Sequence, residues 1–278
     1  MPDSATLLSY APQALILVAA IAAGFVNAIA GGGTFFTYPA FVLGGVPPAL
    51  ASASNNVGLW LGNGMAALAY RRELYAMRQH LPFLSAVTLI GSGLGASMIL
   101  WVGNAGFSRL LPPLVLFATL LFAYAEQVRE WVLRKAEQSS ASEPRPGGSL
   151  RAALGLGVVT VYGGFFGGGV NLMVMASLSL MGYKNVQYSN AIKNFLAVMI
   201  IASVFVVFLI QGGIAWPQTI VCAIGAITGG FIGGSVAKRM PVAWLRGVVI
   251  AVGVVLTIAY TWLYWIKPFL AWRDIAPT

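Results

Sequence analysis

Charged residues are scarce in this chain. Of its 278 residues only 8% are Asp, Glu, Lys or Arg, whereas 59% are hydrophobic, and the mean hydropathy is +0.83. A soluble domain needs far more polar surface to face water. The composition therefore excludes an ordinary soluble domain and predicts a protein that lies in the lipid bilayer.

Cysteine and histidine are rarer still, with one residue of each, Cys222 and His80. A single cysteine excludes an intrachain disulfide and a cysteine-based metal cage. A membrane-embedded enzyme needs a nucleophile with a base, or a metal cluster, and either is hard to assemble from this inventory. We therefore expect no enzyme activity, no metal and no cofactor, with an enzyme as the most distant alternative. We interpret His80, beside a basic connector, as an interfacial residue.

Positive charge exceeds negative charge, with a formal net charge of +9. The lysines and arginines fall in short clusters between apolar runs, which is how positive charge orients membrane segments. A nucleic-acid-binding protein instead gathers its basic residues on one face or along one helix. We therefore expect no nucleic-acid partner, and we expect the basic connectors, including the one at 126–149, to be cytoplasmic.

Ten apolar runs follow one another along the chain. A membrane helix needs about 20 apolar residues at about 1.5 Å per residue, so the second and seventh runs are too short to cross alone. Whether these two cross or re-enter stays open. The runs are Leu7 to Ala30, Thr34 to Leu43, Ala49 to Tyr70, Leu81 to Val102, Phe107 to Ala125, Leu150 to Phe166, Val170 to Met181, Val186 to Ile210, Trp216 to Ala237 and Val242 to Ile266.

The two halves of the chain match residue by residue. A glycine triplet separates the first two runs of each half, at residues 31–33 and 167–169, an offset of 136 residues. Ser52 recurs as Asn190 at an offset of 138 residues. Ordered matches of this kind indicate duplication. We predict a first membrane repeat at 1–125, a charged connector at 126–149 and a second membrane repeat at 150–278.

Two glycine pairs also recur at the offset of 138 residues. Gly91 and Gly95 in the first half correspond to Gly229 and Gly233 in the second. Small residues four positions apart allow membrane helices to approach closely. We interpret these four glycines as structural contacts between helices.

The positive charge further predicts that the repeats are inverted. If the basic connectors are cytoplasmic, the connector at 46–48 faces outside and its counterpart at 183–185 faces inside. The predicted fold is an all-α integral membrane protein with two inverted-topology repeats of about five hydrophobic segments each. Its two glycine-broken hairpins, crossing or re-entrant, would approach each other from opposite sides.

The glycine triplets indicate a binding site near mid-membrane. Backbone N–H and C=O groups at a helix break are tolerated in the bilayer only where they line a polar cavity. Thr34 and Val170 each begin the run after a triplet, so each hairpin can present a helix N-terminus, which attracts anions. The alternative is that the triplets only allow close packing or a flexible turn.

Two polar faces lie in the third and eighth runs. One is formed by Ser52, Asn55 and Asn56 and the other by Asn190, Lys193 and Asn194, each set at positions i, i+3 and i+4 of a helix. The apolar runs contain no obvious carboxylate to neutralise the lysine, although an unpaired charge in the bilayer is costly. An anionic substrate is the natural partner, whereas the alternative is that the lysine snorkels to the interface.

The stretch at 24–33, Gly-Phe-Val-Asn-Ala-Ile-Ala-Gly-Gly-Gly, with Pro39 and Ser54-Asn-Asn56, resembles the first signature of the sulfite exporter TauE/SafE family of transmembrane transporters. The stretches at 162–169 and 188–190 resemble its second. In that family a Thr-Asn-Lys pattern is usual where Ser54-Asn-Asn56 stands, whereas this chain has Lys193 in its second half. The resemblance implies transport of sulfite, sulfonates or related sulfur compounds across the bacterial cytoplasmic membrane, usually outward.

We therefore expect an exporter of small sulfur-containing anions that works by alternating access, with a homo-oligomer as one possible form. An anion-selective channel, or a carrier for a non-sulfur organic anion, remains an alternative. The candidate substrate-binding residues are Asn27, Gly31, Gly32, Gly33, Thr34, Ser52, Asn55, Asn56, Gly167, Gly168, Gly169, Asn171, Ser189, Asn190, Lys193 and Asn194.

Overall fold

The computed structural model describes residues 4–29, 31–138, 150–183, 185–211, 213–236 and 242–270, and their regular structure is entirely helical. Five helical segments within these residues are long and apolar enough to cross a bilayer. They are Ala11–Ala28, Leu81–Ala123, Gln187–Ile210, Trp216–Gly233 and Ala243–Leu270. The prediction of an all-α protein with several membrane-spanning segments is confirmed.

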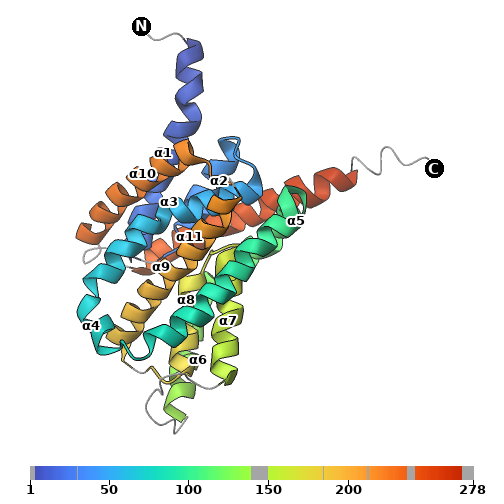
Figure 1. The fold of residues 1–278 in the computed structure, drawn as a ribbon. Coiled ribbons are helices and arrows are strands. Elements are labelled where there is room, and N and C mark those ends of the chain that lie inside the picture. Colours follow the sequence, from blue (N-terminus) through green and yellow to red (C-terminus); the bar gives the residue numbers. More distant parts are fainter. Residues whose placement is uncertain are drawn as a thin grey trace, which may run out of the picture.

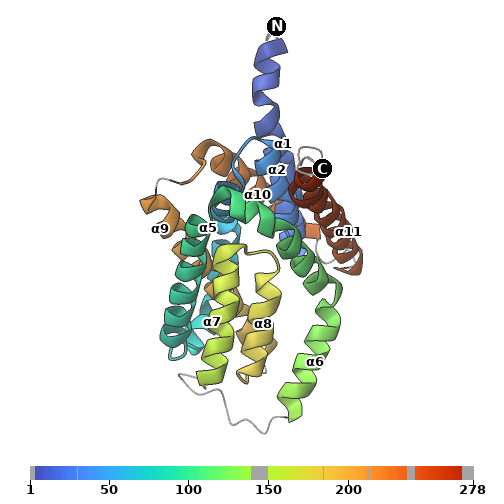
Figure 2. The same cartoon turned by 90° about the vertical axis from the view of Figure 1, so that its right-hand side faces the viewer.

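Most helices follow the predicted apolar runs closely (Figures 1 and 2). The two short runs form helices of 10 and 11 residues, too short to span the hydrocarbon alone. The helices are α1 (Ser4–Ile29), α2 (Thr34–Leu43), α3 (Pro48–Ala69), α4 (Arg71–Ala76), α5 (Leu81–Ala123), α6 (Ala125–Gln138), α7 (Leu150–Phe165), α8 (Val170–Leu180), α9 (Val186–Ile210), α10 (Trp216–Val236) and α11 (Val242–Thr261), with a π-helix at Trp262–Ile266.

The fourth and fifth predicted runs join into α5, which bends at Gly103. This glycine has φ 64° and ψ −179°, a left-handed backbone that a residue with a Cβ avoids. Just after the bend, Asn104 Oδ1 accepts a hydrogen bond of 3.1 Å from the N–H of Ala49, at the start of α3. The bend therefore lies beside the connection between α2 and α3.

Two helices lie in segments that the sequence analysis treated as connectors. The short α4 follows α3, and the charged α6 occupies the first part of the predicted connector at 126–149. An ion pair of 2.8 Å between Arg246 of α11 and Glu126 holds the start of α6 against the bundle. The remainder of that connector, 139–149, lies outside the described residues.

The four glycines interpreted as helix contacts lie at two close helix crossings. A Cβ on Gly91 or Gly95 of α5 would collide with α7, at 2.9 Å from Gly157 O and from Phe165 N respectively. A Cβ on Gly229 or Gly233 of α10 would collide in the same way with the α1 backbone. The prediction for these glycines is confirmed, and each crossing joins a helix of one half to a helix of the other.

The connections between helices gather at two ends of the bundle. The α2–α3 connection lies at the beginning of α3, whereas α4 and His80 follow its far end. His80 Nδ1 forms a hydrogen bond of 2.8 Å with Tyr183 Oη in the α8–α9 connection. The α2–α3 and α8–α9 connections therefore lie at opposite ends of α3. In Figure 1 α4 and α6 are both at the lower end, where α4 packs on α9 and α6 on α8.

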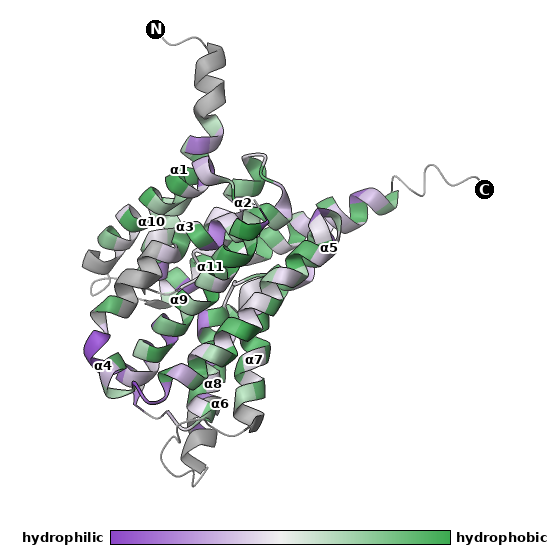
Figure 3. Ribbon diagram, in the orientation of Figure 1, coloured by the Kyte–Doolittle hydropathy of each residue, from purple (hydrophilic) through white to green (hydrophobic). Residues whose placement is uncertain are grey.

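The outer surface of the bundle is apolar, as a bilayer requires. Large side chains such as Trp101, at 87% exposure, and Ile210, at 77%, point away from the core. Figure 3 shows hydrophobic colour along most helices and hydrophilic colour concentrated around α4. The interior is also largely apolar, so the few buried polar residues stand out as candidates for function.

Candidate substrate site at the two glycine breaks

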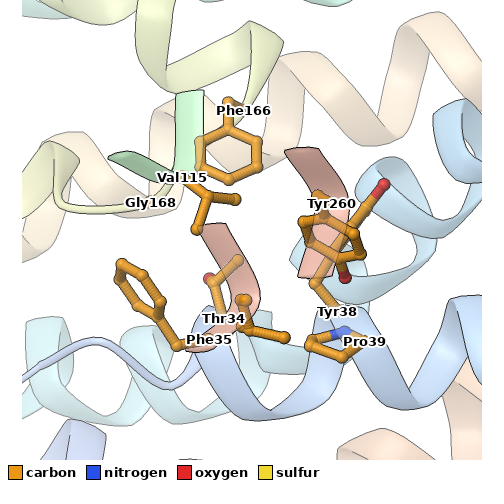
Figure 4. A pocket seen from close by; sticks show the side chains of 9 residues that line it. Thr34, Phe35, Tyr38, Pro39, Val115, Phe166, Gly168 and Tyr260 are labelled. Atoms are coloured by element: carbon orange, nitrogen blue, oxygen red, sulfur yellow. The ribbon is translucent and has the colours of Figure 1, made fainter. Parts of the chain in front are cut away.

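A small pocket lies between α2, α5, α11 and the break that separates α7 from α8 (Figure 4). Its cavity volume is only about 10 Å³, close to the room that one water molecule needs. The pocket marks where the two breaks meet, and it would have to widen to hold an anion. The lining residues are Thr34, Phe35, Tyr38, Pro39, Val115, Phe166, Gly168, Leu256 and Tyr260.

The first glycine break has two residues in the left-handed region, Gly31 with φ 80° and Gly32 with φ 93°. These torsions allow the chain to turn back sharply at the end of α1. The N–H of Gly33, at the start of α2, donates a hydrogen bond of 2.8 Å to Asn27 Oδ1. Asn27 therefore caps the beginning of α2, and the next residue, Thr34, faces the pocket.

The second glycine break repeats part of this geometry. Gly167 with φ 81° and Gly169 with φ 76° are left-handed, and α8 begins at the following residue. The N–H of Gly167 donates to Tyr162 O, as the N–H of Gly31 donates to Val26 O at the corresponding place in the first half. In addition, Tyr162 Oη donates a hydrogen bond of 2.7 Å to Gly168 O, which fixes the glycine that lines the pocket.

The polar face of α3 lies against the second break and is linked to the first through Thr37. Thr37 Oγ1, in the first turns of α2, forms hydrogen bonds with Gly33 O and Asn55 Oδ1. The Asn56 side chain lies against Gly167, so that a Cβ on that glycine would be 2.9 Å from Asn56 Oδ1. In the part of the chain that the structure describes, Ser52 Oγ and the Nδ2 atoms of both asparagines are buried without a hydrogen-bond partner. Unpaired buried donors are rare and point to a missing acceptor.

The polar face of α9 lies apart from the pocket lining. Lys193 is half-buried, and its Nζ donates a hydrogen bond of 3.4 Å to Asn190 Oδ1. Among the described residues no carboxylate lies within ion-pair distance of this lysine. Ser189 Oγ donates to Tyr183 O at 3.1 Å and so supports the start of α9. Asn194 is half-buried one turn further on.

The structure thus brings together part of the predicted site. Of the predicted residues, Thr34 and Gly168 line the pocket, whereas Asn56 of α3 lies against the second break outside the lining. Asn171, after that break, has a buried Oδ1 without a partner among the described residues. The α9 residues, Lys193 included, are outside the pocket lining.

Sequence reasoning missed the aromatic residues that form most of the pocket wall. Phe35, Tyr38, Phe166 and Tyr260 all lie in apolar runs, where aromatic side chains are ordinary core residues. A positional signal was available for three of them, because Phe35 and Tyr38 follow the first triplet and Phe166 directly precedes the second. Tyr260, near the end of the last run, carries no such signal.

These features define a helical, multi-pass membrane protein with a pocket enclosed by interrupted helices. Residues 16–260 match the sulfite exporter TauE/SafE family, and the chain belongs to that family. This confirms the resemblance that the two signatures indicated. It is a family of transporters, not of enzymes.

Relatives of similar length are membrane proteins of bacteria. The "Probable membrane transporter protein" of Haemophilus influenzae is 27% identical over 245 residues, covering 88% of this chain and 92% of the relative. The "Probable membrane transporter protein ORF9" of Sinorhizobium is 25% identical, with 90% and 93% coverage. The "Probable membrane transporter protein YfcA" of Escherichia coli K12 is 25% identical, with 87% of each chain covered. No solved structure shows a significant match.

Proposed function

We propose that this protein exports a small sulfur-containing anion, such as sulfite or an organosulfonate, across the bacterial cytoplasmic membrane. The observation that carries the proposal is that residues of both glycine breaks, Thr34 and Gly168, line one pocket. A site shared by two interrupted hairpins is the arrangement that alternating access requires, because movement of one hairpin against the other opens the site to one side at a time.

The architecture proposed for this carrier is a pair of inverted repeats at 1–125 and 150–278, joined by the cytoplasmic connector at 126–149. Two observations support it. Equivalent connections, α2–α3 and α8–α9, lie at opposite ends of α3. The crossing of α5 on α7 has a counterpart in the crossing of α10 on α1, with equivalent glycines at both. The two short helices would then enter as re-entrant hairpins from opposite faces.

Charge supports one orientation of these repeats. The end of the bundle that carries α4, α6 and Tyr183 also holds Arg71, Arg72, Arg78 and Arg134. Lysine and arginine accumulate in cytoplasmic loops. This end is therefore proposed to be cytoplasmic.

The ligand is proposed to be an anion because the polar groups around the breaks are mostly donors. Buried Ser52, Asn55 and Asn56 have unpaired donor atoms, and Lys193 has no carboxylate partner in the described chain. The acidic residues of the described chain lie in α4 and α6, outside the long apolar spans. All sixteen candidate site residues named from the sequence remain part of this proposal, with the two triplets at its centre.

The membrane potential gives this transport a direction. An inside-negative potential contributes about 2.3 kcal/mol per charge per 100 mV to the exit of an anion. Proton coupling usually relies on Asp or Glu within the spans, and the described spans lack them. Facilitated export that needs no second ion is therefore proposed.

A ligand panel tests the substrate class. Ligands that bind the folded state raise its apparent thermal stability, so sulfite, sulfate, thiosulfate, sulfoacetate and taurine are compared on the detergent-purified protein. We expect stabilisation by at least one sulfur anion. In proteoliposomes the same anion should show saturable uptake and exchange between labelled and unlabelled substrate, which a channel lacks. A flat response to the whole panel would contradict the substrate class.

Single-cysteine labelling tests the inverted architecture. Leu43, at the end of α2, and Leu180, at the end of α8, are exposed, whereas the native Cys222 is fully buried. Cysteines introduced at the two leucines should react with a membrane-impermeant thiol reagent from opposite sides of inside-out and right-side-out vesicles. Labelling of both positions from the same side would refute the inverted repeats.

A further inference from the structure

The hydroxyl of Tyr260 is an unexplained polar group at the pocket. Tyr260 is 6% exposed, and its Oη has no hydrogen-bond partner among the described residues. The other tyrosine of the lining, Tyr38, differs in this respect because its Oη donates a hydrogen bond of 3.3 Å to Pro48 O. Buried tyrosine hydroxyls usually have a partner. The free hydroxyl therefore requires an explanation that the protein alone does not supply.

Packing explains the ring of Tyr260 but not its hydroxyl. The ring makes an edge contact with Tyr38, at 6.3 Å between centroids, and a tilted contact with Tyr264, at 5.9 Å. A phenylalanine would make the same ring contacts without burying an unpaired polar atom. Figure 4 shows the Tyr260 and Tyr38 rings together on one side of the pocket, with Phe35 on the other. The hydroxyl is thus not needed for the packing of the ring.

An irregular helical segment follows Tyr260 closely. The regular α11 ends at Thr261, and the π-helix Trp262–Ile266 follows immediately. π-Helical segments are rare and frequently occur at functional sites. This one is joined to α5, because Trp265 Nε1 donates a hydrogen bond of 2.9 Å to Arg109 O. The segment that follows Tyr260 is therefore tied to a helix that also lines the pocket.

We infer that Tyr260 Oη donates a hydrogen bond to an oxygen of the transported oxyanion when the anion occupies this pocket. The inference rests on the proposed function and assigns a ligand contact to the last helix, which lies outside both glycine breaks and both polar faces. A neutral phenol suits this role because it donates a directed hydrogen bond to an anion in a dry site. Thr34, which lines the same pocket, then supplies a neighbouring contact from the other half of the chain.

The test is a comparison of Tyr260→Phe with Tyr264→Phe, a matched change one turn further along that does not line the pocket. Dissociation constants for sulfite and for sulfoacetate are measured by titration of the purified proteins. We expect Tyr260→Phe to weaken binding about 10- to 100-fold, as for the loss of a hydrogen bond to a charged group. Tyr264→Phe should bind like the wild type.

Ligand-free stability separates a binding role from a structural one. If the hydroxyl serves the ligand, Tyr260→Phe should unfold at the same temperature as the wild type or higher, because the variant no longer buries an unpaired hydroxyl. Wild-type affinity in Tyr260→Phe, or a lower ligand-free melting temperature, would overturn the inference and leave the proposed function standing. If the wild type itself binds neither anion and transports neither, the inference and the proposed function both fail.

Discussion

Replacement of Gly95 by alanine tests the close crossing of α5 on α7. A Cβ at this position would lie 2.9 Å from Phe165 N and closer still to Val161 O, both backbone atoms of α7 that cannot rotate away. The helices must separate to admit the methyl group. Overpacking of this kind costs about 1–3 kcal/mol. Since each kcal/mol changes the Tm of a chain this large by about 2–4 °C, the packing cost corresponds to roughly 2–12 °C, expected as the difference from a control with the same gain in helix propensity.

Gly93→Ala is the matched control. Gly93 lies on the same helix two residues earlier, and a Cβ there meets no atom within 4 Å. Alanine improves helix propensity equally at both positions, by about 1 kcal/mol. The difference in Tm between the two variants therefore isolates the packing cost. Equal melting temperatures for Gly93→Ala and Gly95→Ala would refute the close crossing of α5 on α7.

Thermal unfolding of these variants can be followed through the native cysteine. Cys222 is the single thiol of the chain and is fully buried in the folded state. A thiol-reactive fluorescent dye therefore reports unfolding as Cys222 becomes accessible on heating. The same measurement on Gly233→Ala, where a Cβ would lie 2.6 Å from Phe25 O, should give a similar decrease if the two crossings are equivalent.

Three further predictions concern single side chains. Lys193→Met should weaken binding of the transported anion about tenfold or more without lowering the ligand-free Tm. The control variant Lys267→Met, at an exposed lysine, should bind the anion like the wild type. Equal affinities of the two variants would show that Lys193 is not part of the site. Asn27→Ala removes the acceptor of the Gly33 N–H and should cost about 1 kcal/mol in thermal stability. Burial raises the pKa of Tyr183 to about 12, whereas an unfolded tyrosine has a pKa of about 10. The free energy of unfolding should therefore fall as the pH rises from about 10 to about 12. This fall should be less steep in Tyr183→Phe.

The interruptions of the helices could be predicted from the sequence because glycine leaves a direct signature. The short helices begin at Thr34 and Val170, the residues that follow the triplets. Left-handed torsions at four of the six triplet glycines explain why these positions are glycine. The close crossings could be predicted for a related reason, since only a residue without Cβ fits at Gly95 or Gly229.

The wall of the pocket could not be predicted in the same way. Tyr260 and Phe35 look like ordinary core residues in apolar runs, and only the three-dimensional packing of α11 beside α2 makes them neighbours. The hydrogen bond between Asn27 and Gly33 was also missed, because an asparagine before a glycine triplet gives no indication of which backbone group it meets. The sequence also does not predict the helix α6, because the high charge of this segment is typical of an exposed connector.

The crossing of α10 on α1, which joins the two halves of the chain, has a consequence for biosynthesis. The surface of α1 that receives Gly229 and Gly233 is among the first parts of the chain to be made, and α10 is among the last. Contacts between such distant segments slow folding, because the intervening chain must be organised before they form. After the amino-terminal half is inserted, its α1 surface therefore lacks its contact with α10 until α10 has been synthesised. A chain truncated before α10 would never form this contact.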